Sequence, residues 1–498
     1  MAKRDDKREG RLAIVSNRLP VVLKKRGAKW HVESGSGGLV TALLPVLRNR
    51  GGLWIGWPGL TAQQAGSGFE QVLADASRHA GYELVPILLS EQEKEGFYLG
   101  FSNEIIWPLF HDLHVLCNFD PAYWRIYRDV NEKFAEAIAA NCRNEDYIWV
   151  HDYHLMIVSR CLRDRGIAAP LAFFLHTPFP PLDIFLKLPW RVEILQGLLS
   201  YSLVGLQTLR DRRNLLQCVE NLVADATVEG DGEVVNIRFP DRSVRVGVFP
   251  ISIDFNDFAR RASDKAVGKQ VKAIRQNLPN RKIMLGVDRL DYTKGIPYRL
   301  RAFQNALDRY PDLHGAVSLV QVIVPSRENI PKYSELKTEI DQLVGEINGK
   351  YTQEGWIPVH YLFRSLSQTE LLAYYRASEI ALITPLKDGM NLVAKEYCAS
   401  TIDENGVLIL SEFAGAAGQM QEDALLVNPY DVEGTADAIH DAFVMDLPEK
   451  RRRMKNLREG VKGQDIFTWV DGMLRAGIDK ELKSFPVLQD YLPQIEIS

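Results

Sequence analysis

Short apolar runs alternate along this chain with stretches in which apolar residues recur at helical spacing. An uninterrupted apolar run of this length is typical of a buried strand in a parallel sheet. The runs that we expect to form strands occupy residues 11–16, 53–57, 82–88, 146–150, 171–175, 246–250, 282–287 and 380–383, and the expected helices include 39–48, 129–141 and 265–277. The polar stretch 24–36 predicts a small hairpin. This order of elements predicts an α/β fold with parallel sheets.

The alternation occurs twice, which divides the chain into two α/β series. One series covers residues 11–250 and the other 251–468, after a charged tail at 1–10 that we expect to be disordered. In both series, polar side chains directly follow apolar runs. Open α/β sheets bind ligands at the carboxyl ends of their strands, and two such lobes that face one another form an interdomain cleft. We therefore expect the ligands at the strand ends of both lobes.

The stretch 384–397 carries the strongest local signal. It follows the apolar run 380–383, and Leu392, Val393 and Glu396 fall at helical spacing, so the order is strand, polar turn and helix. A helix that begins just after a strand directs free N–H groups and the positive end of its dipole toward a bound anion. Asp388 in the turn and Glu396 in the helix are spaced to hold different parts of one sugar nucleotide. The alternative is an ordinary β–α connection in which Asp388 caps the helix.

A glycine-rich turn, Gly35-Ser36-Gly37-Gly38, precedes the expected helix at 39–48. Because glycine has no side chain, such a turn lets the backbone approach a phosphate closely. The pattern matches neither the Rossmann nor the Walker motif, so it is weak evidence for a nucleotide site by itself.

A second polar cluster, His151-Asp152-Tyr153-His154, follows the run 146–150. Two histidines and a carboxylate suggest a metal site, but no third His or Cys stands at ligand spacing. A carboxylate at a strand end that faces a ligand is the favoured interpretation. The run 171–175 repeats this arrangement and is followed by His176.

The composition argues against several other classes of protein. The chain has 498 residues and a net charge of −4, so no overall positive charge attracts nucleic acid or anionic membranes. No apolar run is long enough to span a bilayer, and the charged N-terminus lacks the apolar core of a signal peptide. The five cysteines include no C-x-x-C pair, and we expect buried, reduced thiols. These features predict a cytoplasmic enzyme that binds neither nucleic acid nor membrane.

Six segments, in this order, give the chain a family resemblance. They are residues 15–20 (Val-Ser-Asn-Arg-Leu-Pro), 37–39 (Gly-Gly-Leu), 151–155 (His-Asp-Tyr-His-Leu), 175–180 (Leu-His-Thr-Pro-Phe-Pro), 287–295 (Val-Asp-Arg-Leu-Asp-Tyr-Thr-Lys-Gly) and 388–396 (Asp-Gly-Met-Asn-Leu-Val-Ala-Lys-Glu). Together they resemble the trehalose-6-phosphate synthases, over about residues 11 to 485. The resemblance implies two Rossmann-like lobes (the GT-B fold), with a C-terminal helix, 469–498, that returns to the first lobe. It also implies transfer of glucose, with retention, from a nucleotide diphosphate glucose to glucose 6-phosphate.

The resemblance assigns the donor to the C-terminal lobe. Arg289 and Lys294 would stabilise the leaving diphosphate, and two positive charges suit the charge that builds up there. Glu396 would hold the ribose, Asp388 the hydroxyls of the donor glucose, and His176 its 6-hydroxyl. The complete set of implied donor-binding residues is Gly37, Gly38, Arg289, Lys294, Asp388, Gly389, Met390, Asn391, Leu392, Val393 and Glu396.

The acceptor is assigned mainly to the N-terminal lobe. Arg18, Tyr98 and Arg327 would bind the 6-phosphate, with Trp57, Trp107 and Asp152 shaping the sugar pocket. The implied catalytic residues are Arg289, Lys294, Asp152 and His176. One segment departs from the family: residues 110–119 differ from the shorter stretch expected after Trp107, which affects the outer wall of the acceptor pocket.

Several alternatives remain beside this interpretation. Taken singly, Arg289 and Lys294 are as well explained as surface charges, and Tyr98, Trp57 and Trp107 as core residues. The competing activity is that of a glucosylglycerol-phosphate synthase, and a third alternative is a silent regulatory homologue. We expect no cofactor and no metal. The expected partners are glucose 6-phosphate and UDP-glucose, with ADP- and GDP-glucose as other donors, and self-association remains open.

Overall fold

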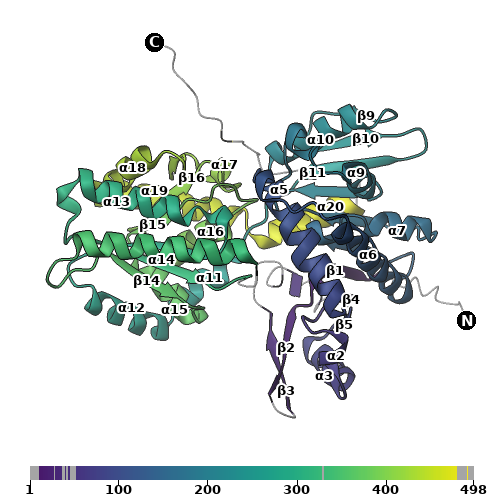
Figure 1. Cartoon of the computed structure of the whole chain (residues 1–498), viewed down its shortest axis with the longest axis horizontal. Helices are drawn as coiled ribbons and strands as arrows, with labels where there is room; N and C mark the ends of the chain where they lie inside the picture. Colours follow the sequence, from purple (N-terminus) through teal and green to yellow (C-terminus); the bar gives the residue numbers. More distant parts are fainter. Residues whose placement is uncertain are drawn as a thin grey trace, which may run out of the picture. The chain divides into compact units, whose positions relative to one another are not determined.

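A computed structural model describes residues 10–26, 29–35, 40, 43–44, 47, 52–327, 330–478 and 491. These residues divide into two compact units (Figure 1). Unit 1 takes the described residues up to Pro250 and those of the last helix from Trp469 onward, and unit 2 takes Ile251–Thr468 and Tyr491. Each unit is an α/β structure around its own sheet, as the two alternating series predict. The expected tail and the glycines Gly37 and Gly38, with most of the expected helix 39–48, lie outside the described residues.

Unit 1 contains a nine-stranded sheet among the described residues, in the order β5-β4-β1-β6-β7-β8-β11-β10-β9. Neighbouring strands are parallel from β5 to β11, and β10 and β9 are antiparallel additions at one edge. In sheet order the strands are Glu83–Pro86, Gly52–Trp57, Leu12–Arg18, Tyr147–His151, Leu171–Phe174, Leu203–Leu206, Ser243–Val248, Val234–Arg238 and Thr227–Glu229. The central strands are buried along their whole length, because crossover helices cover both faces of a parallel sheet.

The helices of unit 1 lie between these strands in the sequence. They are α2 (Ala62–Ala65), α3 (Phe69–Ala80), α4 (Glu91–Glu93), α5 (Trp107–Phe110), α6 (Pro121–Asn141), α7 (Val158–Asp164), α8 (Leu182–Phe185), α9 (Arg191–Leu198) and α10 (Leu209–Leu222). The long helix α6 begins where Asp120 caps Ala122 N and a proline occupies the first helical position. The predicted hairpin is present as β2 (Val21–Arg26) and β3 (Lys29–Ser34).

Residues Lys94–Ile106, for which the sequence predicted no regular element, form a π-helix, η1. It packs against α6, where Gly96 lies against Ile126 and Gly100 against the Tyr123 ring. π-Helical segments are uncommon and are often found at functional sites. Here the segment carries Tyr98, one of the expected acceptor residues.

Unit 2 contains a six-stranded parallel sheet, counted over the described residues, in the order β14-β13-β12-β15-β16-β17. In that order the strands are Val359–Phe363, Val317–Val324, Lys282–Arg289, Ile380–Ile383, Val407–Ser411 and Leu425–Val427. The helices are α11 (Phe255–Ala262), α12 (Lys265–Asn277), α13 (Ile296–Arg309), α14 (Pro331–Tyr351), α15 (Gln368–Ala377), α16 (Leu392–Ser400), α17 (Ala417–Met420), α18 (Val432–Val444) and α19 (Leu447–Gly463). The order places β12 next to β15, although their sequences are far apart.

The last helix, α20 (Ile466–Ile478), belongs mostly to unit 1. In Figure 1 this yellow helix lies among the purple-to-teal elements of that unit. The fit is close: a side chain at Gly477 would collide with the Tyr147 hydroxyl, and Met473 lies against Gly205 of β8. The last helix therefore packs against the sheet with which the chain began, as the family resemblance implied.

The cysteines correct one expectation. All five are free thiols, but only Cys218 and Cys398 are buried, and Cys117, Cys142 and Cys161 are partly exposed. The depth of a cysteine depends on which distant segments pack over it, and no local sequence pattern shows this. None of the helices in the described ranges is both long and apolar enough to cross a membrane.

Candidate active site

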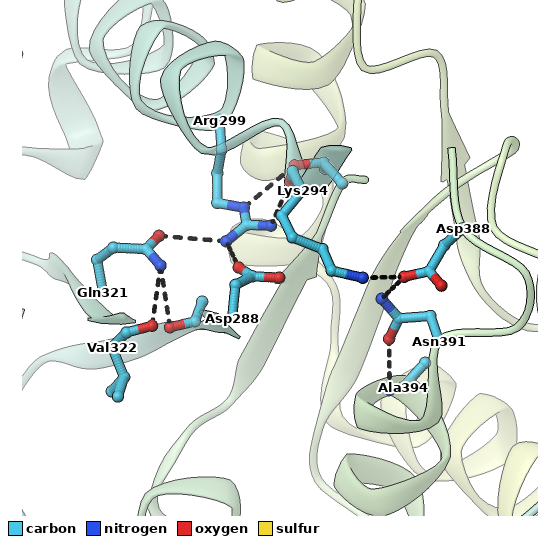
Figure 2. A network of polar contacts seen from close by, with 10 residues as sticks. Asp288, Lys294, Arg299, Gln321, Val322, Asp388, Asn391 and Ala394 are labelled. Carbon is cyan, nitrogen blue, oxygen red and sulfur yellow. Dashed lines mark hydrogen bonds and ion pairs between the residues drawn. The ribbon is translucent and has the colours of Figure 1, made fainter. Parts of the chain in front are cut away.

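A buried arginine ties together the strand ends of unit 2 (Figure 2). Arg299, from the helix that follows β12, is 1% exposed and forms an ion pair with Asp288 at the end of that strand. The nitrogen that faces Asp288, Nη1, also donates to Gln321 Oε1 of β13 at 3.2 Å, and Nε donates to Thr384 Oγ1 beyond β15 at 3.1 Å. A guanidinium suits this position because its planar fork serves several acceptors at once. The network fixes β12, β13 and the segment after β15 relative to one another. The expected donor residues Arg289, Lys294 and Asp388 follow within a few residues of Asp288 or Thr384.

Lys294 and Asp388 meet beside this network. The Lys294 ammonium lies 2.6 Å from Asp388 Oδ2, and the same oxygen accepts from Asn391 Nδ2 at 3.1 Å (Figure 2). Asn391 also caps α16, since its Oδ1 accepts from Ala394 N at 3.2 Å. The structure therefore excludes the alternative in which Asp388 caps the helix. Asp388 contacts the lysine instead, and its backbone N–H is bonded to Phe413 O.

Three cations surround one buried carboxylate next to this pair. Asp291 is 1% exposed; it accepts from Thr293 N at 3.1 Å, and its Oδ2 lies 3.5 Å from Arg327. Burial by itself would raise the pKa of Asp291, but Arg327, Arg289 and Lys294 hold that pKa below its usual value. The cluster has more positive than negative charge, which suits an anionic ligand.

Glu396 lies in α16, two turns beyond Asp388 in the sequence. Its Oε2 accepts from the Tyr375 hydroxyl of α15 at 2.8 Å. Burial raises the pKa of Glu396, and the tyrosine hydrogen bond opposes that shift. One carboxylate oxygen is thus held by the protein, while the other can accept hydroxyls of a ligand.

In unit 1, Arg18 lies between two aromatic rings. Its guanidinium carbon is 4.0 Å from the centre of the Trp57 ring and 5.7 Å from that of Tyr98. Gly59, with a φ of +88°, makes room for the guanidinium, because a Cβ at that position would collide with it. Tyr98 stacks in turn on His154 at 6.0 Å. Three of the expected acceptor residues, Arg18, Trp57 and Tyr98, are therefore in mutual contact.

Asp152 and His176 also meet. They follow the neighbouring strands β6 and β7, and Asp152 Oδ1 accepts from His176 N at 3.3 Å. Asp152 has a φ of +73°, a conformation that non-glycine residues rarely adopt and that functional sites often contain. The carboxylate and the imidazole thus stand at adjacent strand ends, as expected.

Trp107, another expected acceptor residue, packs against two other aromatic rings. It is 7% exposed and packs on His111 at 4.3 Å and on Tyr153 at 5.7 Å between ring centres. His111 belongs to the unusual segment 110–119, so this segment reaches Trp107 through a buried ring. Val115, in the same segment, is 79% exposed.

Sequence reasoning missed the residues that hold the site together. Asp291 stood inside a quoted motif, but Arg299, Gln321, Tyr333 and Tyr375 gave no local signal. Tyr333 accepts from Arg327 at 2.7 Å. These residues lie near the motif residues only because of the order of the strands in the sheet, so the sequence alone does not identify them. Among the described residues, no group of three or more His, Cys, Asp or Glu side chains is placed to hold a metal ion.

Two α/β units with parallel sheets and polar side chains at the strand carboxyl ends are the architecture of the GT-B glycosyltransferases. The chain belongs to glycosyltransferase family 20, whose model matches residues 10–476.

Three known proteins illustrate the relationship. The trehalose-6-phosphate synthase of Mycolicibacterium vanbaalenii is 41% identical, over 94% of this chain and 96% of that protein. A bifunctional trehalose-6-phosphate synthase/phosphatase of Thermoproteus tenax is 41% identical over 92% of this chain, which spans only 62% of that relative's length. The crystal structure of a UDP-forming α,α-trehalose-phosphate synthase from Burkholderia xenovorans, in complex with glucose 6-phosphate, superposes with a TM-score of 0.84 at 33% identity, covering 94% of this chain and 99% of the other.

Proposed function

We propose that this chain transfers glucose from UDP-glucose to glucose 6-phosphate with retention, giving α,α-trehalose 6-phosphate and UDP. Membership of family 20 and the similarity to a UDP-forming synthase in complex with glucose 6-phosphate support both substrates. The observation that carries the proposal is a cluster in which three cations, Arg289, Lys294 and Arg327, stand against two carboxylates, Asp291 and Asp388. Such an excess of positive charge is what a diphosphate leaving group requires.

Each donor residue has a role that its chemistry can perform. Arg289 and Lys294 neutralise the charge that develops on the leaving diphosphate. Asp388 accepts hydroxyls of the glucose, and Glu396 accepts those of the ribose. The backbone from Gly389 to Val393, through Met390, Asn391 and Leu392, binds the nucleotide at the start of α16. Gly37 and Gly38, outside the described residues, contribute backbone N–H groups to the phosphates.

The acceptor phosphate is bound by arginine side chains and a tyrosine. Arg18 and Arg327 provide planar guanidinium groups, which suit phosphate oxygens, and Tyr98 adds a hydroxyl. Trp57 and Trp107 provide apolar surface for the hexose ring, and Asp152 accepts one of its hydroxyls. The 110–119 segment acts on acceptor choice through His111 and Trp107.

We further propose a route that retains the anomeric configuration without a glucosyl-enzyme and without a metal. A covalent route needs a free carboxylate opposite the leaving group, whereas Asp388 and Glu396 are assigned to hydroxyls. The leaving phosphate accepts the proton of the attacking hydroxyl, with Arg289 and Lys294 stabilising it. A trapped glucosyl-enzyme, or activity that EDTA abolishes and a divalent ion restores, contradicts this route.

The proposal is tested with a matrix of substrates. UDP-, ADP- and GDP-glucose are each combined with glucose 6-phosphate, free glucose and glycerol 3-phosphate, and product configuration is read by NMR. We expect turnover with UDP-glucose and glucose 6-phosphate and an α,α-linked product. Preference for glycerol 3-phosphate would indicate glucosylglycerol-phosphate synthesis, and no turnover with any pair would indicate a silent homologue. We also propose a cytoplasmic location, because all five cysteines are free thiols, and cell fractionation tests it.

A further inference from the structure

Two histidines, one of them fully buried, face each other at the strand ends of unit 1. His151 ends β6, and His176 follows the adjacent strand β7. Their nearest ring nitrogens, His151 Nδ1 and His176 Nε2, are 3.2 Å apart. His151 has no exposed surface, whereas His176 is partly exposed. A hydrogen bond at this distance requires one nitrogen to carry the proton and the other to accept it.

Aromatic side chains hold both rings in place. Trp149 lies 4.7 Å from His151 between ring centres, and Phe174 lies 4.7 Å from His176. Trp469, the first residue of α20 within unit 1, lies 6.3 Å from His151 and 6.2 Å from His176. Burial in this cluster lowers the pKa of His176 to about 3, and that of His151 falls well below its usual value. Both rings are therefore neutral at physiological pH.

The surroundings of His151 indicate which of the two facing nitrogens, His151 Nδ1 or His176 Nε2, carries the proton. His151 Nε2, Trp149 Nε1 and Trp469 Nε1 are buried, and none has a hydrogen-bond partner in the described part of the chain. The two indole nitrogens are donors only. If His151 Nε2 also carried a proton, three buried donors would share one cluster without an acceptor. If Nε2 is instead unprotonated, the aromatic cluster of Trp149, His151 and Trp469 contains one unpaired acceptor and two unpaired donors. The second arrangement is favoured because it does not add a third buried donor to a cluster that, among the described residues, has no other unpaired acceptor.

We propose that His151 is a positioning residue that donates from Nδ1 to His176 Nε2 and thereby fixes the proton of His176 on Nδ1. His176 then presents a neutral N–H donor to a hydroxyl oxygen of the donor sugar, rather than a base. The inference rests on the proposed function only for the identity of that ligand. The tautomer itself follows from the His151–His176 distance and the three buried nitrogens.

The ring nitrogens can be observed directly in the full-length protein without substrate. Protein labelled with ¹⁵N-histidine is examined by long-range ¹H–¹⁵N correlation, and His151→Phe and His176→Phe variants assign the signals. We expect a pyrrole-type Nδ1 and a pyridine-type Nε2 for both residues. The opposite tautomer at His176, or a charged ring at pH 7, overturns the proposal whether or not the chain is a glucosyltransferase.

Kinetics test the positioning role. The side-chain nitrogen of asparagine replaces Nδ1 of histidine, so His151→Asn should keep most of the donor kcat/KM. His151→Phe should lower it about three- to tenfold, the effect of one neutral hydrogen bond, with KM for glucose 6-phosphate unchanged. His79→Phe, on the exposed helix α3, is the matched control and should behave as wild type. Equal losses in the Asn and Phe variants, or a loss confined to thermal stability, contradict the role.

Discussion

The Lys294 ammonium lies 2.6 Å from Asp388 Oδ2, with only 13% and 15% of the two side chains exposed. The pair joins the turn after β12 to the turn after β15, and Asn391 holds the same carboxylate oxygen. In this geometry both the ammonium and the carboxylate are already fixed, as the proposed donor site requires. Few groups then have to reorganise when a nucleotide sugar binds.

Replacing Asp388 by Asn should therefore impair donor use much more than stability. The variant loses the charged acceptor for the glucose hydroxyls and releases Lys294 from its fixed position. Charge-assisted hydrogen bonds contribute about 1.5–3 kcal/mol, so kcat/KM for UDP-glucose should fall about ten- to a hundredfold. Steady-state kinetics with all three nucleotide glucoses measure the effect.

The surface pair Lys337–Asp341 of α14 offers a matched control. Asp341→Asn also removes the carboxylate of an Asp–Lys pair, but both of its partners are more exposed, so activity should not change. Wild-type kinetics for Asp388→Asn would exclude the turn before α16 from the donor site.

Tyr375→Phe should shift the acidic limb of the pH profile. Glu396 must be ionised to accept ribose hydroxyls, and burial already raises its pKa. The Tyr375 hydroxyl stabilises the ionised form, so its removal raises the pKa further and donor binding fails at higher pH than in wild type. We expect the acidic limb of kcat/KM for UDP-glucose to move up by about 0.5–1 pH unit. Tyr374→Phe, the next residue on the same helix, should leave the limb in place.

Arg327→Lys should weaken the binding of glucose 6-phosphate specifically. Arg327 contacts both Asp291 and the Tyr333 hydroxyl, and an ammonium cannot reproduce these contacts while it binds phosphate. The KM for glucose 6-phosphate should rise about tenfold in Arg327→Lys and up to about a hundredfold in Arg327→Ala.

The surface Arg301, paired with Glu339, is the control for this change, and Arg301→Lys should have wild-type constants. Since Arg327 shares Asp291 with the donor cations, the KM for UDP-glucose is measured in parallel. A rise confined to the donor KM would assign Arg327 to the donor phosphates and contradict the acceptor role.

Because Lys395 is buried, we expect the free energy of unfolding to rise at alkaline pH. Lys395 is 1% exposed, donates to Ile251 O at 2.8 Å, and burial lowers its pKa from 10.5 to about 7. Above about pH 7 the folded state holds the neutral amine, while the unfolded chain still binds a proton up to pH 10.5. The unfolded state then binds more protons, so the free energy of unfolding rises with pH, by at most about 1.4 kcal/mol per unit.

Denaturant unfolding at pH 7.5 and 9.5 measures this term as a difference between wild type and Lys395→Met. Wild type should gain about 2–3 kcal/mol relative to the variant over this interval, because other ionisations are common to both. The exposed Lys337→Met should show no such difference. Parallel pH dependences of wild type and Lys395→Met would mean that Lys395 keeps its proton in the folded state.

Local patterns in the sequence predicted many of the elements, but not the strands Leu203–Leu206, Val359–Phe363, Val407–Ser411 and Leu425–Val427. Strands need apolar runs and helices need a period near 3.6, and both signals are contained in a few consecutive residues. The turn between Ile383 and Leu392 is one example, and the helix Lys265–Asn277 has the bounds that its spacing predicted. The sequence did not predict the π-helix Lys94–Ile106. Its two glycines allow close contact with side chains of α6, and this contact is visible only in the tertiary structure.

The sequence by itself determined the chemical groups at the strand ends, since Arg289, Lys294, Asp388 and Glu396 follow from the order of motif and element. Only the tertiary structure decided their partners. Lys294 contacts Asp388 because β12 and β15 are adjacent in the sheet, although 94 residues separate the two side chains. The same holds for Arg299 with Thr384 and for Lys395 with the carbonyl of Ile251. Strand order and burial depth depend on packing between distant segments, and no local pattern encodes them.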